Sequence, residues 1–335
     1  MDTSRGDLRH AGRGSGPPEE DERLSPAPTP EGALPSVVTR PAYVAVMPDL
    51  ATLPTRPLLS LSPSRALDFQ SCPLLYRFRV LDRLPEPPSP SAVRGTLVHA
   101  VLEALYDLPA PRRTLDEAIS LVAPQWQRLA AERPEVIGML GELGDDPTAW
   151  LRAAGDLVEA YFGMEDPQRL EPAARELRVE VELASGLVLR GFVDRLDRAS
   201  SGALRVVDYK TGRPPGVGYE ARAMFQMRFY ALVLWRMHGV VPTQLQLMYL
   251  ATGVVLRYEP DEADLVAMER KIEALFAAIQ RATTTGDWRA RPSATCSWCA
   301  HQALCPAWGG TPPPLPEAPA SAACSGVEVA GGGDG

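Results

Sequence analysis

The sequence predicts an α/β protein with a mixed (α+β) sheet, and three observations carry this prediction. Residues 175–184 alternate between apolar and charged side chains, which is typical of a half-buried strand. Turn sequences at 185–186 and 200–202 then separate two more strands, which indicates a three-stranded meander ending at Lys210. A helical pattern and another apolar strand follow the meander, so helices and strands contribute to the same core.

The ordered region is expected to begin with short helices. A Ser-Pro pair at 62–63 is suited to start a helix, and Cys72-Pro73 interrupts the helical pattern. A proline-rich linker at 85–90 then leads into a helix that contains His99. The broad apolar face of that helix predicts that it is largely buried.

The remaining elements follow the periods of their side chains. Two or three amphipathic helices are expected within an insertion at about 110–165, in which no chemistry is evident. After the meander come a helix at 219–238 and strands at 244–250 and 254–259. An amphipathic helix at 261–284 closes the core.

The two ends of the chain have the composition of disordered segments. Residues 1–57 are rich in Pro, Gly, Ser and charge, and residues 309–335 are rich in Pro, Gly and Ala. The ordered domain is therefore expected at 58–308. Met47 opens the segment that leads into this domain, so translation could start there, and Cys324 in the second tail is expected to be a free thiol.

Charge and hydropathy limit the classes of function only loosely. The net charge is -8, and much of it lies in the two tails, so charge neither indicates nor excludes nucleic-acid binding. The first 30 residues are polar and no apolar run approaches the ~20 residues of a membrane span, so a cytoplasmic protein without a membrane partner is expected. Five cysteines in that compartment indicate metal ligands or free thiols.

Charged residues interrupt the two apolar strands of the meander. Asp208 and Lys210 leave the same face of the strand 204–210, and Asp194 has a similar setting on the preceding strand. Two acids on neighbouring strands with a nearby lysine can bind a hard divalent cation and hold an ammonium beside a water. A buried Asp-Lys salt bridge is the structural alternative. Glu180 and Glu182 on the first strand are interpreted as exposed carboxylates.

The choice of lysine at this position is informative. Lys210 and Lys271 are the only lysines among 34 basic residues, so nearly every other cation is arginine. A compact ammonium can sit against a water or a phosphate in a way that a planar guanidinium cannot. Lys210 is therefore a candidate catalytic residue.

Three cysteines close to the end of the ordered region predict a metal site. Cys296, Cys299 and Cys305 have the spacing C-x2-C-x5-C, which indicates ligation in a cytosolic chain. A fourth ligand must come from elsewhere, and His301 is one candidate if the metal is zinc.

These residues resemble the PD-(D/E)XK nuclease superfamily, and specifically its RecB-like exonuclease branch, over about 61–306. No single motif decides the resemblance, but their joint order and spacing do. The histidine of a Gly-x-x-x-His helix start falls on His99, the metal-binding acid on Asp194 in GFVDRLD, the (D/E)XK motif on Asp208-Tyr209-Lys210, and the QxxxY of the next helix on Gln226 and Tyr230.

The resemblance implies a restriction-endonuclease-like core with a divalent metal centre. Mg²⁺ or Mn²⁺ would be held by His99, Asp194, Asp208 and the backbone carbonyl of Tyr209. The imidazole ligand suits Mn²⁺ somewhat better than Mg²⁺. Lys210 would orient or help to deprotonate the attacking water. The last two catalytic candidates, Gln226 and Tyr230, would position the lysine strand or the nucleic-acid backbone.

A Ser-x-Ser followed by Cys72-Pro73 is similar to the RecB-like nucleases that carry an iron-sulfur cluster. That resemblance implies Cys72 as the fourth ligand of a [4Fe-4S] cluster with Cys296, Cys299 and Cys305. Such a cluster would join the two ends of the domain and act as a structural staple. Structural Zn²⁺ remains the alternative.

The function that the resemblance implies is metal-dependent hydrolysis of phosphodiester bonds at DNA strand ends, in recombination or repair. No G-x-x-x-x-G-K-[ST] motif is present, so a helicase partner would be a separate chain. Two alternatives remain. One is a non-catalytic DNA-binding or scaffold subunit of a helicase-nuclease complex, and the other is a CRISPR-adaptation-type nuclease.

Overall fold

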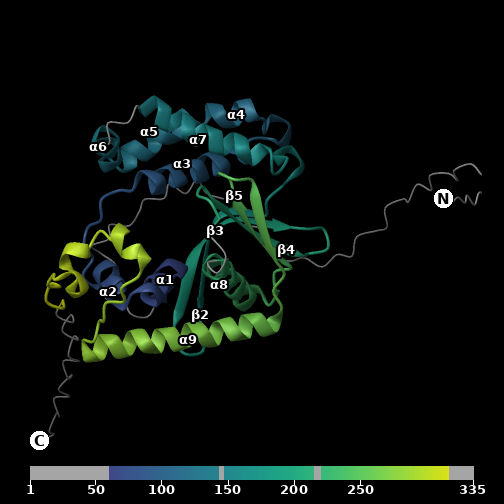
Figure 1. Ribbon diagram of the computed structural model, residues 1–335. Coiled ribbons are helices and arrows are strands. Elements are labelled where there is room, and N and C mark those ends of the chain that lie inside the picture. The colour runs from purple at the N-terminus through teal and green to yellow at the C-terminus, as the bar shows by residue number, and fades with distance from the viewer. Residues whose placement is uncertain (1–59, 143–146, 215–219, 317–335) are drawn as a thin grey trace, which may run out of the picture. The chain divides into compact units, whose positions relative to one another are not determined.

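A six-stranded mixed sheet forms the centre of the domain (Figure 1). The computed structural model describes residues 60–142, 147–214 and 220–316. Its strand order is β1-β3-β4-β5-β6, and β2 also pairs with β3. The strands are β1 Ser60–Leu61, β2 Ala174–Glu182, β3 Val188–Arg198, β4 Leu204–Lys210, β5 Gln244–Tyr249 and β6 Val254–Tyr258.

The predicted meander and the mixed sheet are confirmed. β2 pairs antiparallel with β3, and β3 pairs antiparallel with β4. β5 then pairs parallel with β4, because helix α8, Glu220–His238, crosses over between them. β1 pairs parallel with the start of β3 and was not expected, since two residues are too few to show alternation.

Helices cover both faces of the sheet and create two cores (Figure 1). α1, α8 and α9 pack on one face, and α3 with the inserted helices packs on the other. The side chains of β4 alternate between the two faces of the sheet. Val206 lies in the first core, while Val207 and Tyr209 lie in the second. The last residues of β4 therefore lie between two packed helical layers.

The predicted helix boundaries have identifiable causes. α1, Pro63–Ser71, begins where the Ser62 hydroxyl accepts a hydrogen bond from the Arg65 amide, and α2, Pro73–Tyr76, follows the predicted break. A short π-helical segment, Arg77–Leu81, continues from α2. α3 spans Pro90–Leu105 and carries His99.

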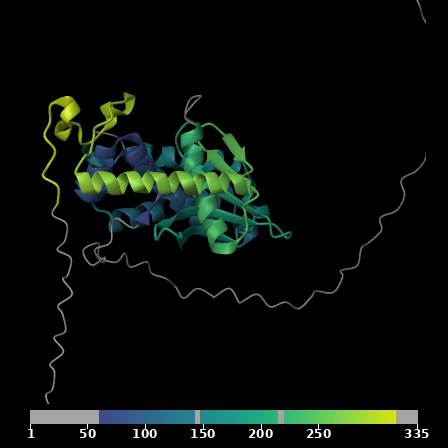
Figure 2. The same ribbon diagram turned by 90° about the horizontal axis from the view of Figure 1, so that it is seen from below.

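The longest described helix is α9, Glu262–Thr285, which begins with a capping box and ends at Gly286 in the left-handed region. In Figure 2 it runs across the domain, and the C-terminal segment with the cysteines lies beyond its end. No helix in the described ranges is both long and apolar enough to cross a membrane.

The described part of the insertion contains four helices instead of the two or three predicted. They are α4 Leu115–Ser120, α5 Val122–Glu132, α6 Glu135–Glu142 and α7 Pro147–Phe162. α4 and α5 are separated by Leu121 alone, so the apolar period continues across the break and conceals it from the sequence.

The expectations about residues 1–57, Met47 and Cys324 fall outside the described residues. Part of the second predicted tail, up to residue 316, is described. There the Arg77 guanidinium donates a hydrogen bond to the carbonyl of Pro313.

Candidate active site

The four side chains predicted from the (D/E)XK and QxxxY motifs form one hydrogen-bonded chain. Lys210 Nζ lies 2.6 Å from Asp208 Oδ2 and donates to Gln226 Oε1 at 2.9 Å. The amide of Gln226 donates to Asp208 Oδ1 at 2.8 Å and contacts the Tyr230 hydroxyl at 3.2 Å. The alternation of β4 and the four-residue spacing on α8 bring these groups together.

The charge of Asp208 keeps Lys210 protonated despite its burial. Burial lowers the pKa of its ammonium, but the charge of Asp208 and the hydrogen bond with it outweigh burial, so the pKa is raised. Asp208 itself is only 1% exposed. A protonated lysine at this position favours orientation of a water and stabilisation of negative charge over proton abstraction.

Gly191 on β3 allows Tyr230 to reach the chain of polar side chains. A Cβ atom at Gly191 would lie 2.6 Å from Cε1 of Tyr230, which is shorter than any real contact. The ring therefore lies directly against the backbone of β3 because position 191 has no side chain.

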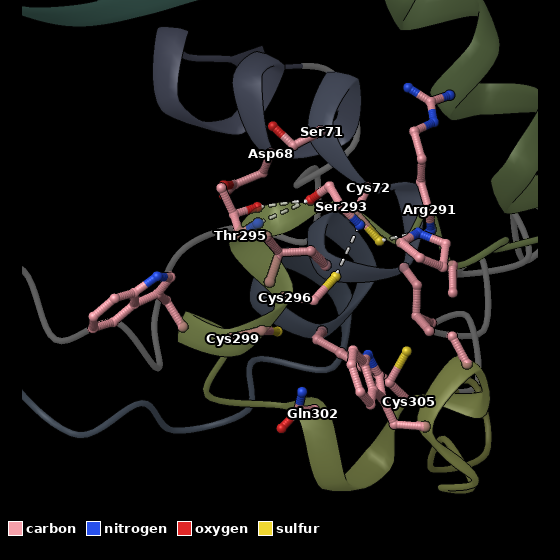
Figure 3. A pocket seen from close by; sticks show the side chains of 18 of the residues that line it. Asp68, Ser71, Cys72, Arg291, Ser293, Thr295, Cys296, Cys299, Gln302 and Cys305 are labelled. Carbon is pink, nitrogen blue, oxygen red and sulfur yellow. Dashed lines mark hydrogen bonds between the residues drawn. The ribbon is translucent and has the colours of Figure 1, made fainter. Parts of the chain in front are cut away.

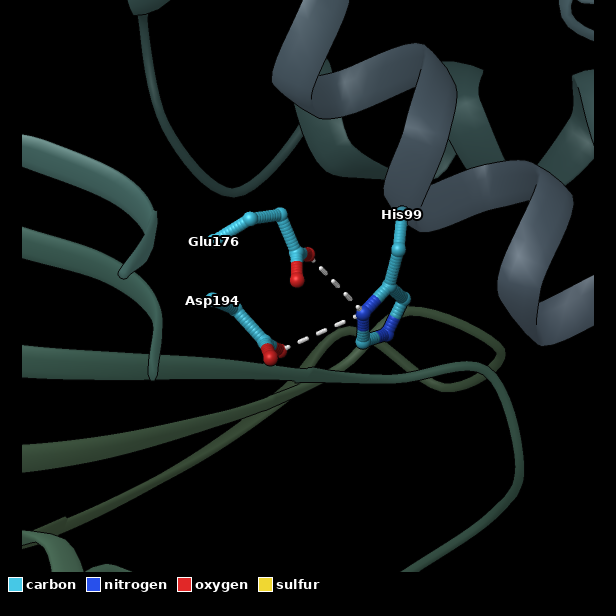
Figure 4. Close-up of side chains that lie close together, drawn as sticks. All are labelled: His99, Glu176 and Asp194. Atoms are coloured by element: carbon cyan, nitrogen blue, oxygen red, sulfur yellow. Dashed lines mark ion pairs between the residues drawn. The ribbon is translucent and has the colours of Figure 1, made fainter. Parts of the chain in front are cut away.

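A second cluster contains the predicted ligands His99 and Asp194 (Figure 4). His99 Nδ1, from α3, lies 3.5 Å from Asp194 Oδ2 and 3.8 Å from Oε1 of Glu176 on β2. One ligand atom from each of the three residues lies within 4.8 Å of the others. A nitrogen and two carboxylate oxygens are donors that Mn²⁺ or Mg²⁺ accepts, so the residues fit a divalent cation.

Tyr209 stands between Asp208 and Lys210 of the first cluster, and its backbone contacts the second cluster. Its N–H donates to Asp194 Oδ2 at 2.8 Å, and its carbonyl oxygen lies 2.9 Å from His99 Nε2. The structure therefore brings the predicted ligands His99, Asp194 and the Tyr209 carbonyl together. The carboxylate of Asp208, the fourth predicted ligand, is engaged by Lys210 and Gln226 instead.

Burial and neighbouring charges shift two pKa values in the second cluster. Burial lowers the pKa of His99, but Glu176, Asp194 and Asp208 outweigh it and raise the pKa to about 9. Burial, followed by the charge of Asp208, raises the pKa of Asp194 to about 7. Without a metal, the imidazolium is the cation that these carboxylates face.

Glu176 was missed by the sequence interpretation, which considered Glu180 and Glu182 on the same strand. Those two carboxylates are exposed, as expected. Glu176 has a φ of 40° and stands opposite Asp194 in the register, and strand alternation alone does not distinguish it from Glu180 and Glu182 on the same face.

A cavity of about 420 Å³ opens over the two clusters. His99, Tyr209 and Lys210 line it together with the loop at 211–213 and the first turns of α3. Arg213 is the cation that this loop adds to the lining, in a position to meet a phosphate. One side chain of each polar cluster, Lys210 of the first and His99 of the second, therefore faces the cavity.

Residues 60–306 match the family model of the PD-(D/E)XK nuclease superfamily. The chain belongs to this superfamily. The match covers both polar clusters and the whole sheet. It supports nuclease chemistry at the cavity and confirms the predicted PD-(D/E)XK fold.

Individual relatives of this PD-(D/E)XK protein come from bacteriophages. The Gene 69 protein of Mycobacterium phage D29 is 30% identical over 199 residues, which cover 53% of this chain and 70% of the relative. The Gene 69 protein of Mycobacterium phage L5 is 25% identical over 292 residues, covering 75% and 98%. A solved protein from Eubacterium rectale, named provisionally as an exonuclease, is 12% identical with a TM-score of 0.49, covering 73% of this chain and 88% of its own.

Beneath the PD-(D/E)XK site lies a buried arginine that the sequence interpretation did not single out. Arg195 follows Asp194 on β3 and is 0% exposed. Its guanidinium donates to the hydroxyls of Tyr209 at 2.7 Å and Tyr106 at 3.2 Å, and pairs with Glu165 at 2.8 Å. Further partners are Tyr161 and Asp197. These contacts fix the side chain of Tyr209, whose backbone contacts the second cluster.

The four predicted cysteine ligands line one pocket of about 290 Å³, remote in sequence from the (D/E)XK motif (Figure 3). Cys72 Sγ accepts from the Arg291 amide at 3.4 Å, and Cys296 Sγ accepts from the Ser293 amide at 3.3 Å. Burial raises the pKa of Cys299. The imidazole of His301 is directed elsewhere, since its Nε2 lies 2.7 Å from Glu86 Oε1.

Proposed function

We propose that this chain is a metal-dependent DNA exonuclease of the RecB-like branch, hydrolysing phosphodiester bonds at strand ends. The observation that carries the proposal is that the backbone of Tyr209, which lies between Asp208 and Lys210 in the chain, is hydrogen-bonded to both His99 and Asp194. One cluster can hold a divalent cation, and the other presents a protonated lysine fixed by Asp208 and Gln226. DNA is the proposed substrate, in a cytoplasmic repair or recombination reaction with any helicase on a separate chain.

In this mechanism Mg²⁺ or Mn²⁺ would be held by His99 and Asp194, joined after reorientation by Asp208 and the Tyr209 carbonyl. When bound, the cation supplies charge stabilisation at the scissile phosphate. Lys210 orients the attacking water and offsets charge on the pentavalent phosphorus. The water oxygen forms a new bond to phosphorus as its proton passes to solvent, the phosphorus–oxygen bond to the leaving nucleotide breaks, and the leaving oxygen takes up a proton from solvent.

Gln226 and Tyr230 hold Lys210 at the position where it acts. Gln226 bridges Lys210 and Asp208, so it restricts both side chains at once. Tyr230 contacts the same amide from one turn further along α8. Because both residues act through Lys210, they are proposed as positioning residues.

We also propose that Cys72, Cys296, Cys299 and Cys305 bind a [4Fe-4S] cluster. All four thiols line one pocket, and the His301 imidazole faces Glu86, which supports four cysteine ligands at one site. The resemblance to iron-sulfur RecB-like nucleases favours a [4Fe-4S] cluster, and structural Zn²⁺ is the alternative.

The first prediction concerns Lys210. Purified without oxygen and supplied with Mg²⁺ or Mn²⁺, the protein should degrade end-labelled linear DNA and leave circular single-stranded DNA intact. Lys210→Ala should lower the rate at least ~100-fold, since loss of one charge-stabilising donor costs that much in comparable sites. Cleavage of labelled single- and double-stranded substrates is the measurement.

Lys271→Ala is the matched control for Lys210→Ala. Lys271 is the other lysine of the chain, and it lies on α9 with its ammonium 5.1 Å from the centre of the Phe225 ring. Equal cleavage by wild type and Lys210→Ala would contradict the assignment. Binding of DNA without cleavage in either metal would instead support the scaffold-subunit alternative.

A further inference from the structure

Strand β2 loses its alternation at Glu176. Glu176 has a φ of 40°, in the left-handed region, and no cross-strand partner is formed at this position, although Arg175 and Leu177 on either side are paired with β3. Arg175 and Glu176 consequently both reach toward α3. Arg175 Nη1 donates to the carbonyl of Glu103 at 2.7 Å, and Glu176 Oε1 lies 3.8 Å from His99 Nδ1.

The backbone at Glu176 is unfavourable for a residue with a long side chain. Left-handed backbone at non-glycine residues costs free energy and persists where the surrounding structure imposes it, often at ligand sites. Only Arg83 and Glu176 adopt it among the non-glycine residues of the described ranges. At Glu176 the result is a carboxylate directed at the imidazole of the metal cluster.

Two carboxylate oxygens face His99 Nδ1, which carries a proton in the metal-free protein and gives that proton up when a cation binds there. A neutral His99 that donates its Nε2–H to the Tyr209 carbonyl presents the lone pair of Nδ1 to Glu176 and Asp194. Such an arrangement holds together around a positive charge. Neighbouring ligands of an octahedral cation with bonds of about 2.1 Å lie about 3 Å apart, so separations of 3.5 Å and 3.8 Å require only small side-chain movements.

We propose that Glu176 is a direct carboxylate ligand of the divalent cation, together with His99 Nδ1 and Asp194. The inference rests on the proposed metal-dependent function and extends it, since none of the ligands implied by the family motifs lies on β2. Glu176 adds a negative charge to the centre. It therefore raises the affinity of the site for hard divalent cations.

The first arm of the test measures metal binding without DNA. Isothermal titration with Mn²⁺ should give at least ~10-fold weaker binding to Glu176→Gln than to wild type. Glu180→Gln should bind as wild type does, because Glu180 is on the same strand, exposed, and paired with Arg178. Wild-type Mn²⁺ affinity in Glu176→Gln would overturn the proposal.

The second arm separates a direct ligand from a residue that only orients His99. Glu176→Cys should bind Cd²⁺ more tightly than wild type and show an added ultraviolet thiolate-to-cadmium absorption band. Glu180→Cys, measured alongside, gives the background from the native cysteines. Absence of an added band in folded Glu176→Cys would overturn direct ligation, and circular dichroism verifies folding in both arms.

DNA cleavage by the wild type, measured separately, distinguishes failure of this inference from failure of the proposed function. Metal binding that depends on Glu176 in a protein that cuts no DNA would leave the ligand assignment intact and remove the nuclease assignment. If the wild type cuts DNA and Glu176→Gln binds Mn²⁺ as tightly as the wild type, the nuclease assignment stands and the ligand assignment fails.

Discussion

His99 and Asp194 together determine how the metal-free site responds to pH. Both groups hold protons more tightly in the folded protein than in the unfolded chain, because His99 faces carboxylates and Asp194 is buried beside Asp208. The stabilisation from His99 is complete below its ordinary pKa of 6.5 and is lost as pH rises through about 9. The contribution of Asp194 is lost earlier, as pH rises from its ordinary value of 3.8 through about 7.

The stability of the metal-free protein should therefore fall as pH rises between about 6.5 and 9. Thermal midpoints measured in the presence of EDTA across this range test the expectation. His99→Gln should flatten the dependence. His238→Gln, at the exposed end of α8, should leave it unchanged, and a wild-type curve that matches His99→Gln would contradict the pKa assignment.

Residues that belong to a recognisable motif could be placed from the sequence, whereas Glu176 could not. Asp208 and Lys210 lie side by side as alternation predicted, and Gln226, which the resemblance implied, contacts both. Glu176 depends on one left-handed backbone angle and on the approach of α3, neither of which has a local signature. Sequence patterns report which face a residue occupies in regular structure, so an irregularity at the site escapes them.

The guanidinium of Arg195 joins elements that are far apart in sequence. Its partners Tyr106 and Tyr161 belong to the helical layer, and Tyr209 lies on β4 beside the active site. Glu165, just after α7, completes the connection. Because both charges are largely buried, the insertion is attached to the sheet by a contact that is costly to break on one side only.

Arg195→Met should lower the free energy of unfolding by about 3 kcal/mol, since it leaves largely buried carboxylates with one cation fewer. Arg205 stays beside Asp197 and limits the loss. Urea unfolding is the measurement, and Arg198→Met, at the exposed end of β3, is the control. A loss no larger than that of Arg198→Met would show that the network contributes little to stability.

Regular elements were predicted where their period was long enough to detect. The meander, α8 and α9 match their predicted ranges to within a few residues. β1 and the break between α4 and α5 were missed because each involves too few residues to change a period. The pairings of β1 with β3 and of β4 with β5 arise from packing that no local pattern encodes.

The two sequence ends of the described domain meet at the cysteine pocket. Cys72 follows α1, while the other three thiols come more than 200 residues later, after α9. A link across so long a loop removes much conformational freedom from the unfolded chain. The proposed cluster would therefore stabilise the whole domain while lying apart from the catalytic cavity.

Cys72→Ser should abolish bound iron and lower the thermal midpoint by about 10 °C, from loop closure worth about 4 kcal/mol. Iron analysis and calorimetry of anaerobically purified protein are the measurements. Cys324→Ser removes the fifth cysteine and serves as the control. Full iron content in Cys72→Ser would show that the fourth ligand is a residue other than Cys72.

The contact between Gly191 and Tyr230 also limits how this protein can diverge. Any side chain at position 191 collides with the tyrosine ring, so an inherited change there survives only after the ring has become smaller. A smaller residue at 230 gives up the hydroxyl that meets Gln226, and the catalytic lysine loses part of its support. The two positions are thus expected to vary together among descendants, and a lineage that loses the pair holds Lys210 less firmly.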